Sequence, residues 1–283
     1  MTALPPVSVI NLFTGEREAL LTLLAGLSAA EWALATACPG WSAHDLALHL
    51  LGDDVGRLSQ GRDGYSGYAD AVAATGVDLS EWEALVTFIN QQNATWVNAT
   101  RRIGPRLLCE FLRMTGDATS AYFAHLDLQA VGSPVEWAGP APAPVWLDVA
   151  REYTERWVHH QHIRDAVGQP GLKEPRWFAP VLDTFVRALP HALRYMTAPQ
   201  GASVQLVITG EAGGDWWTVR TADAWALVRE HGSTPLASVR LDQGTAWRLW
   251  TRGIDKGQAL ARMGHVGDDA AVSAILDMVS ILA

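Results

Sequence analysis

Residues 147–167 read LDVAREYTERWVHHQHIRDAV and, as a helix, present two faces of different chemistry. One face has two carboxylates and two imidazoles at the positions i, i+3, i+7 and i+10, which are Glu152, Glu155, His159 and His162. Val149, Tyr153 and Trp157 lie on another face, where they can join a core. The spacing therefore predicts a helix that packs in a core, carries ionisable groups along one side and ends at Gly168.

Most of the first 200 residues have the apolar periodicity of helices. Helices are predicted near residues 11–27, 42–59, 80–103, 105–128 and 175–196, and a short one follows Ser28. Their first turns carry start signals, a serine with an acidic residue three positions later or a leading proline: Ser28 with Glu31, Ser42 with Asp45, Ser80 with Glu83, and Pro105. Residues 61–78 and 132–144 are predicted as loops.

The pattern changes near residue 200 from helical periodicity to the alternation typical of strands. Strands are predicted at 203–209, 216–220, 225–230 and 236–241, with helices at 244–251, 256–263 and 270–282. The chain is therefore predicted to be mainly α, with a helical bundle in residues 1–200 and a small α+β domain of mixed sheet and helices in residues 201–283.

Composition excludes several functional classes. A net charge of −9 argues against a nucleic-acid-binding protein and against docking on anionic lipid, both of which require a basic surface. No run approaches the roughly 18 apolar residues that a membrane helix needs, and the N-terminus lacks the pattern of a signal peptide. Two cysteines cannot form a disulfide framework or a thiolate metal cluster. We expect a cytoplasmic monomer or homodimer.

Glu155 and His159 are four residues apart, so both can reach one ion beside the helix. Carboxylate and neutral imidazole are normal zinc ligands. The best candidate for a third ligand is His49, which lies among leucines and is expected to point inward. Asp45 and Asp53 lie four residues to either side of it, and either can orient its imidazole.

These residues also have plainer interpretations. His49 can be a hydrogen-bonded core histidine, and Glu155 and His159 can be solvated side chains on a helix surface. The run from His159 to His162 can likewise be a surface cluster without function. Spacing alone does not decide between these interpretations and a metal site.

Residues 38–50 read CPGWSAHDLALHL, which resembles the Pro-Gly-Trp-Ser/Thr-x-x-Asp-Leu/Val-x-x-His-Leu signature of the DinB-like bundles. More closely, the chain is similar to the N-terminal domain of the mycothiol-dependent maleylpyruvate isomerases. The resemblance implies a four-helix bundle with a divalent metal ion, most simply zinc, held by His49, Glu155 and His159. The family often has Asp where this chain has His162, so His162 stays open as an acid–base group, an outer-shell residue or another ligand.

Two C-terminal segments, residues 246–249 (AWRL) and 264–268 (GHVGD), resemble the sterol-carrier-like domain that follows many of these bundles. The family resemblance further implies an enzyme that uses mycothiol or another low-molecular-weight thiol on a small, anionic substrate. Thiol addition to a double bond, rotation and elimination would give isomerisation, and addition alone would give thiol transfer. His162 and Arg248 are the predicted catalytic residues, with Arg156 and Arg164 as further candidates for binding the anion.

Other functions remain compatible with the sequence. Tryptophans such as Trp216 and Trp217 are compatible with a non-catalytic protein that binds an apolar ligand. Three ligands and an open position would also suit hydrolysis by a metal-bound hydroxide, and the same donors can bind nickel, iron or manganese. Cys38 precedes a Pro-Gly turn without an accompanying triad, which argues against a nucleophilic cysteine.

Overall fold

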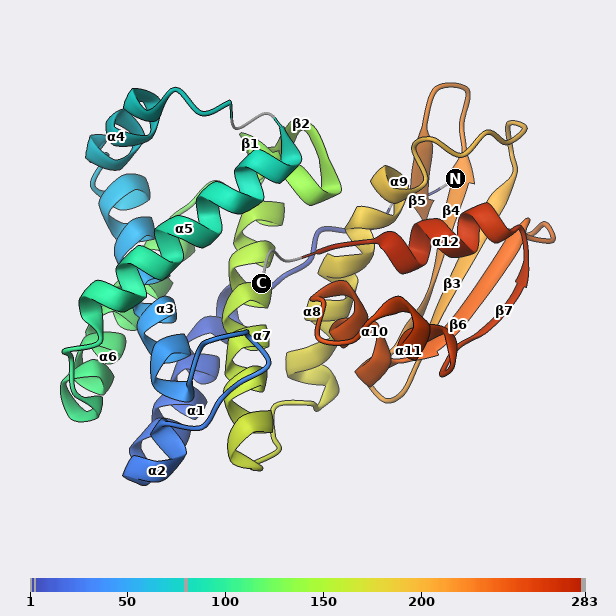
Figure 1. Cartoon of the computed structure of the whole chain (residues 1–283). Helices are drawn as coiled ribbons and strands as arrows, with labels where there is room; N and C mark the ends of the chain where they lie inside the picture. Colours follow the sequence, from blue (N-terminus) through green and yellow to red (C-terminus); the bar gives the residue numbers. More distant parts are fainter. Residues whose placement is uncertain (1, 3, 79–80, 281–283) are drawn as a thin grey trace. The chain divides into compact units, whose positions relative to one another are not determined.

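A computed structural model of the protein describes residue 2, residues 4–78 and residues 81–280 (Figure 1). The chain divides into two compact units. We call Ile10–Leu126 with Arg156–Pro170 the helical unit, and Met1–Val9 with Asp127–Glu155 and Gly171–Ala283 the sheet unit. Both units include part of one helix, α7 (Val145–Val167), because the division falls between Glu155 and Arg156.

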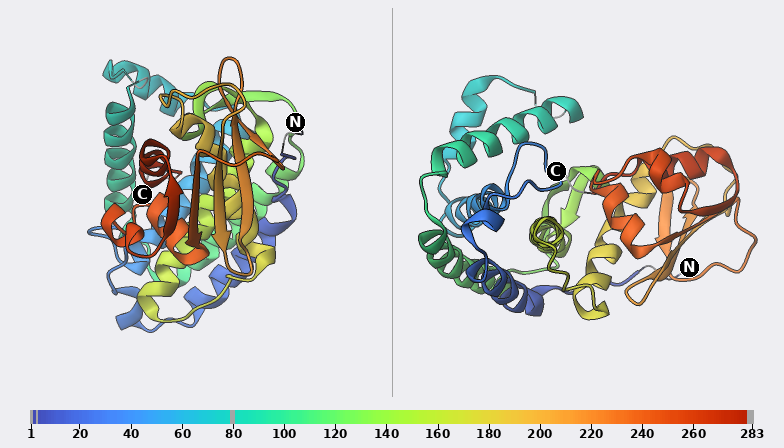
Figure 2. Two further views of the ribbon diagram at one scale, coloured as in Figure 1. Left: turned by 90° about the vertical axis from the view of Figure 1, so that its right-hand side faces the viewer. Right: turned by 60° about the horizontal axis from the view of Figure 1, so that its bottom comes forward.

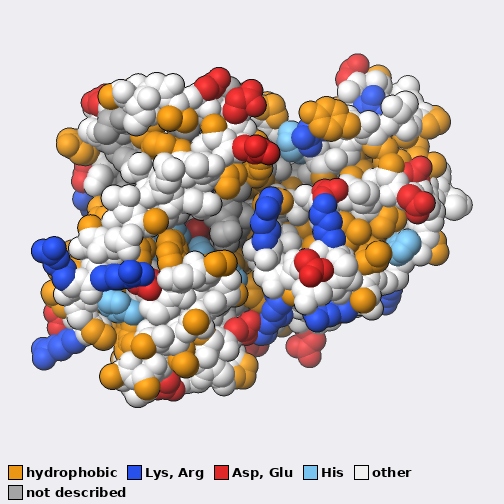
Figure 3. Space-filling view, viewed as in Figure 1, with side chains coloured by type: hydrophobic (Ala, Val, Ile, Leu, Met, Phe, Trp, Pro, Cys, Tyr) orange, Lys and Arg blue, Asp and Glu red, His pale blue; other side chains and the backbone are white. Residues whose placement is uncertain are grey.

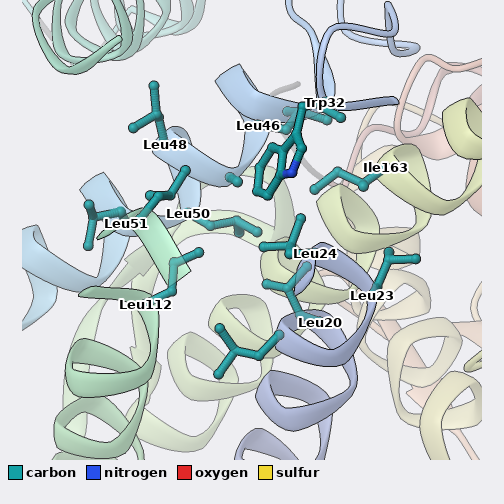
Figure 4. Packing of buried hydrophobic residues seen from close by; sticks show 14 of the residues in the cluster. Leu20, Leu23, Leu24, Trp32, Leu46, Leu48, Leu50, Leu51, Leu112 and Ile163 are labelled. Carbon is teal, nitrogen blue, oxygen red and sulfur yellow. The ribbon is translucent and has the colours of Figure 1, made fainter. Parts of the chain in front are cut away.

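The helical unit is a bundle, as its sequence predicts. Besides α7 its long helices are α1 (Phe13–Ala25), α3 (Ala43–Gly56), α5 (Trp82–Thr100) and α6 (Pro105–Ala124). The shorter elements are η1 (Ile10–Leu12), α2 (Ala29–Trp32), η2 (Arg57–Arg62) and α4 (Gly67–Thr75). Leucines of α1, α3 and α6 meet Ile163 of α7 in one core, and Trp32 lies among them (Figure 4). The four helices α1, α3, α6 and α7 therefore share one apolar core, and this core packs α3 against α7.

Predicted start and stop signals are found at the helix ends. Ser28 with Glu31 and Ser42 with Asp45 both form complete capping boxes, and Pro105 is the first residue of α6. Gly168 follows the last residue of α7 with φ +67°, a left-handed conformation that glycine adopts without strain. The predicted Ser80–Glu83 signal includes Ser80, which lies outside the described residues, and α5 begins at Trp82 with Glu81 at its N-cap.

Ser42→Ala is expected to destabilise the protein by about 1 kcal/mol, because the backbone N–H of Asp45 loses its acceptor at the start of α3. Urea unfolding followed by circular dichroism measures this loss. Ser66→Ala is the matched control, since Ser66 occupies the N-cap of α4 without a side-chain capping bond. An equal loss in the two variants would contradict a capping role for Ser42.

Buried charges lie beside the apolar core of the helical unit. Asp54 is fully buried and accepts hydrogen bonds from Arg17 (2.7 Å), Arg156 (2.9 Å) and Thr115 (2.8 Å). Burial by itself would raise the pKa of Asp54, but the two guanidinium groups and their hydrogen bonds outweigh it and hold the pKa below its ordinary value. This network ties α1, α3, α6 and α7 together through one carboxylate.

The larger sheet of the sheet unit has five strands in the order β5-β4-β3-β6-β7: β3 (Ser203–Thr209), β4 (Gly214–Arg220), β5 (Trp225–Val228), β6 (Ala237–Asp242) and β7 (Gly264–Gly267). Only β3 and β6 are parallel. The helices α10 (Gln243–Trp250), α11 (Lys256–Leu260) and α12 (Asp269–Asp277) lie on one face of the sheet (Figure 2). Val204, Leu206 and Val239 are buried in this unit, which has the mixed sheet and helices that the sequence predicts.

Four segments differ from their predictions. No strand is predicted at residues 264–267, where β7 pairs with β6; all four of its residues are exposed, so no apolar alternation marks it. The predicted loop at residues 61–78 contains α4, whose alanine-rich sequence favours a helix and whose end is capped by Gly76 at φ +67°. The predicted loop at 132–144 is instead a hairpin of β1 (Val131–Val135) and β2 (Gly139–Pro144), separated by η3 (Glu136–Ala138). The predicted helix at 175–196 is broken into α8 (Pro175–Phe185), η4 (Val186–Ala188) and α9 (Leu189–Ala192), because Pro190 fits only a first helical turn.

The predicted boundary near residue 200 lies just before β3 begins at Ser203. In the structure the sheet unit also takes in α8, α9 and the hairpin of β1 and β2. Among the described residues, no helix is both long and apolar enough to cross a lipid bilayer. On the face drawn in Figure 3, basic side chains lie among acidic and apolar ones, so neither sign of charge covers that face.

Candidate metal centre

Helix α3 holds His49 in the interior of the helical unit. Leu48 and Leu50 on either side of it are fully buried, and His49 itself is only 4% exposed, as its leucine-rich setting predicts. Its ring lies 5.2 Å from that of Trp41 and 4.7 Å from that of His159, measured between centroids. A second imidazole, from α7, therefore faces His49, and the role of His49 as a metal ligand stays a prediction.

His49, Glu155 and His159 come together as predicted. Each offers a ligand atom, and the three atoms lie within 4.8 Å of one another. Glu155 and His159 share one side of α7, one turn apart, and the continuous helix places both. Glu155 is half-buried, whereas both histidines are buried. The interpretation of His159 as a solvated surface residue is thereby excluded.

Asp53 is the acidic neighbour of His49, at 3.4 Å between Oδ2 and Nε2. Asp45, the other sequence candidate, is used elsewhere. It caps α3 and accepts hydrogen bonds from Arg101 at 2.8 and 3.2 Å. Partial burial opposes its ionisation, but the bonds from Arg101 and Ser42 prevail and keep the pKa of Asp45 below its ordinary value. Of the two sequence candidates, Asp53 is therefore the carboxylate that lies beside His49.

A second group, which sequence reasoning missed, includes Cys38. The Cys38 Sγ lies 3.4 Å from Nδ1 of His162 and 3.9 Å from Nδ1 of His159. A tight turn places the thiol there: Trp41 N donates to Cys38 O, Thr36 Oγ1 accepts from Cys38 N, and Gly40 takes φ +80°. One ligand atom from each of Cys38, His159 and His162 lies within 4.8 Å of the others.

The remaining ionisable residues of α7 have other partners. Glu152, predicted on the same face as Glu155, accepts from Arg151 at 2.8 Å. His160 is fully buried with Nδ1 2.7 Å from Glu16, and burial lowers its pKa despite the opposing effect of Glu16. The histidines at 159, 160 and 162 are all at least 97% buried, so the interpretation of this run as a surface cluster is wrong.

The arginines proposed to bind an anion are placed differently from one another. Arg156 is buried and paired with Asp54, which corrects its assignment to substrate binding. Arg164 donates to Nε2 of His160 and to Gln169 O. Arg248 belongs to α10 in the sheet unit, where it donates to Gly244 O and stacks on Trp247 at 4.5 Å. Its predicted catalytic role stays a prediction.

Comparisons with known proteins address the same segments. A family model described as the mycothiol maleylpyruvate isomerase N-terminal domain matches residues 13–164, more than half of the 283 residues. Two crystal structures of the mycothiol-dependent maleylpyruvate isomerase, one of a mutant, are similar at 12% and 14% sequence identity, with TM-scores of 0.49 and 0.48. Each alignment covers 89% of this chain and 92% of the solved chain. A comparison with curated protein sequences finds no match.

Proposed function

The chain belongs to the mycothiol maleylpyruvate isomerase N-terminal domain family, and from this premise we propose that it is a divalent-metal-dependent enzyme. The proposed cosubstrate is a low-molecular-weight thiol such as mycothiol. The proposed reaction is isomerisation of, or thiol transfer to, a small anionic molecule with an activated double bond. The observation that carries this proposal is the convergence of His49, Glu155 and His159 within 4.8 Å.

The three donors fit zinc. Two imidazoles and one carboxylate are a normal catalytic ligand set that leaves one position open. Zinc lies about 2.0–2.1 Å from such donors, so a tetrahedral ion needs them roughly 3.3 Å apart. Donor atoms within 4.8 Å can reach that spacing by small side-chain rotations. Nickel, iron and manganese accept the same donors, and the metal is therefore to be identified by measurement.

When bound, the ion would lower the pKa of a thiol at the open position and so supply a nucleophile at neutral pH. Addition of the thiolate to the double bond leaves a single bond about which the product can rotate. Elimination then restores both the double bond and the thiolate, without net oxidation. The residues of the chain hold the site in a mostly buried setting, where His49 and His159 are at least 96% buried. His162 and Arg248 remain proposed as the proton carrier and the anion-binding group.

Elemental analysis of the purified protein, combined with an isomerisation assay, tests this function. We expect about one zinc per chain, and activity on maleylpyruvate that requires both the metal and an added thiol. Glu155→Gln and His49→Ala are expected to lose that activity while remaining folded. Metal-free protein with undiminished activity would overturn the metal dependence, and activity without any thiol would overturn the thiol dependence.

Asp53→Asn is expected to raise by about 10–100-fold the zinc concentration that restores activity to metal-depleted protein, because the carboxylate beside His49 loses its charge. The measurement is a zinc titration of activity with a metal buffer. Asp63→Asn serves as the control, since Asp63 is exposed and paired with Arg62. Equal zinc requirements for the Asp53 and Asp63 variants would remove Asp53 from the site.

A further inference from the structure

Cys38 lies in the bundle interior next to two imidazoles that both come from α7. The thiol, His159 and His162 are 8%, 2% and 3% exposed. The three residues belong to the helical unit, and their side chains are set by one turn and one helix. Cys38 Sγ lies 3.4 Å from Nδ1 of His162 and 3.9 Å from Nδ1 of His159, so the thiol is close to both imidazole rings.

One thiolate and two imidazoles make a softer donor set than two imidazoles and one carboxylate. Thiolate favours zinc and other soft ions, at about 2.3 Å for zinc–sulfur. The three candidate ligand atoms lie within 4.8 Å of one another, and those of His49, Glu155 and His159 also lie within this limit. His159 belongs to both sets, so occupation of one set by an ion competes with the other.

We propose that Cys38, His159 and His162 form a second, sulfur-containing ligand set for a divalent metal ion in this chain. Binding in this set exchanges the thiol proton of Cys38 for the metal–sulfur bond and releases that proton to solvent. While an ion occupies this set, His162 is a ligand and does not carry protons; when the set is empty, the proton-carrier role proposed above stands. This second set shares His159 with the site of the proposed function. It does not depend on His49 or Glu155, and it does not require that the protein is an enzyme.

The two ligand sets have opposite consequences for an external thiol. With His49, Glu155 and His159 the ion keeps a position for a thiol from solution. With Cys38 the ion already holds a sulfur ligand from the chain itself. The balance between the sets therefore regulates how readily a cosubstrate thiol can bind.

Cobalt(II) titration of the full chain tests the second set, because a cobalt–thiolate bond gives an intense near-ultraviolet charge-transfer band that oxygen and nitrogen donors do not give. We expect this band in the wild-type protein and in His49→Ala, and its loss in Cys38→Ser. Cys109→Ser is the matched control, since Cys109 is the only other cysteine of the chain and is half-buried in α6. Circular dichroism checks that each variant is folded.

A measurement on the unaltered protein accompanies the variants. Zinc is expected to slow the alkylation of Cys38 several-fold and to leave the alkylation rate of Cys109 unchanged. Peptide mass spectrometry measures both rates. Bound cobalt without a thiolate band, or a band that persists in Cys38→Ser, would overturn the second set and leave the proposed function intact. A thiolate band in a protein without thiol-dependent activity would support the second set and overturn the proposed function.

Discussion

His159→Ala is expected to remove stoichiometric zinc from the protein, reducing it from about one ion per chain to a trace. His159 is the one residue common to both candidate ligand sets, so its loss leaves two protein ligands in each. The effect should exceed the roughly 10–100-fold weakening that follows loss of an outer-shell neighbour. Dialysis against a metal buffer followed by elemental analysis measures the zinc that remains.

His44→Ala is the control for this experiment. His44 lies on α3, five residues before His49, but its Nε2 is 2.8 Å from Ile103 O and it belongs to neither ligand set. The variant should keep its zinc. If His159→Ala also retains one zinc per chain, both proposed ligand sets are wrong.

Asp54→Ala is expected to cost about 3–5 kcal/mol of unfolding free energy, the range for removing one partner of a buried ion pair. Two guanidinium groups, those of Arg17 and Arg156, would then stay buried without their carboxylate. A loss of this size is a large fraction of the total stability of an ordinary domain. Guanidinium chloride unfolding, monitored by tryptophan fluorescence, gives the free energy.

The depressed pKa of Asp54 also fixes the sign of a pH effect. Its stabilising contribution is complete above the ordinary carboxyl value of 3.8 and is lost as the pH falls through the lower pKa of the folded state. The stability difference between the wild type and Asp54→Ala should therefore shrink only at pH values below about 3.8. Asp63→Ala, which removes an exposed partner of Arg62, should leave stability unchanged at any pH. A difference that is already gone at about pH 5, above that window, would contradict this account.

The parts of the fold that the sequence predicts are those with local signals. Ser42 with Asp45 and Pro105 mark helix starts through bonds and dihedral angles within one turn, so they can be recognised without tertiary structure. Strands β3 and β6 are recognisable because buried residues alternate with more exposed ones along most of each strand, whereas the short β5 and β7 show no such alternation. The hairpin at Val131–Pro144 was missed because four prolines argue against strands, although prolines are tolerated in an isolated two-stranded pair.

The residues of the candidate site likewise differ in whether a local sequence signal marks them. Glu155 and His159 are recognisable because one helix turn joins them, and His49 because it ends a specific local motif. The family assignment made from residues 38–50 is confirmed by the family-model match at residues 13–164. Cys38 is separated from His159 by 121 residues, and no periodicity connects a turn with a distant helix. The resemblance of residues 246–268 to a sterol-carrier-like domain stays a prediction.

Helix α7 has no solvent-facing side between Arg156 and Ile163, since all eight residues are buried although most of them are polar or charged. Helices at a protein surface tolerate substitution on every third or fourth position, which gives saturation mutagenesis data a helical rhythm. Over these two turns this periodicity should be absent, and substitutions should be poorly tolerated at all eight positions. A sequence library randomised there would consequently yield few folded members, so new variants of this bundle are better sought in the residues that surround α7 than in α7 itself.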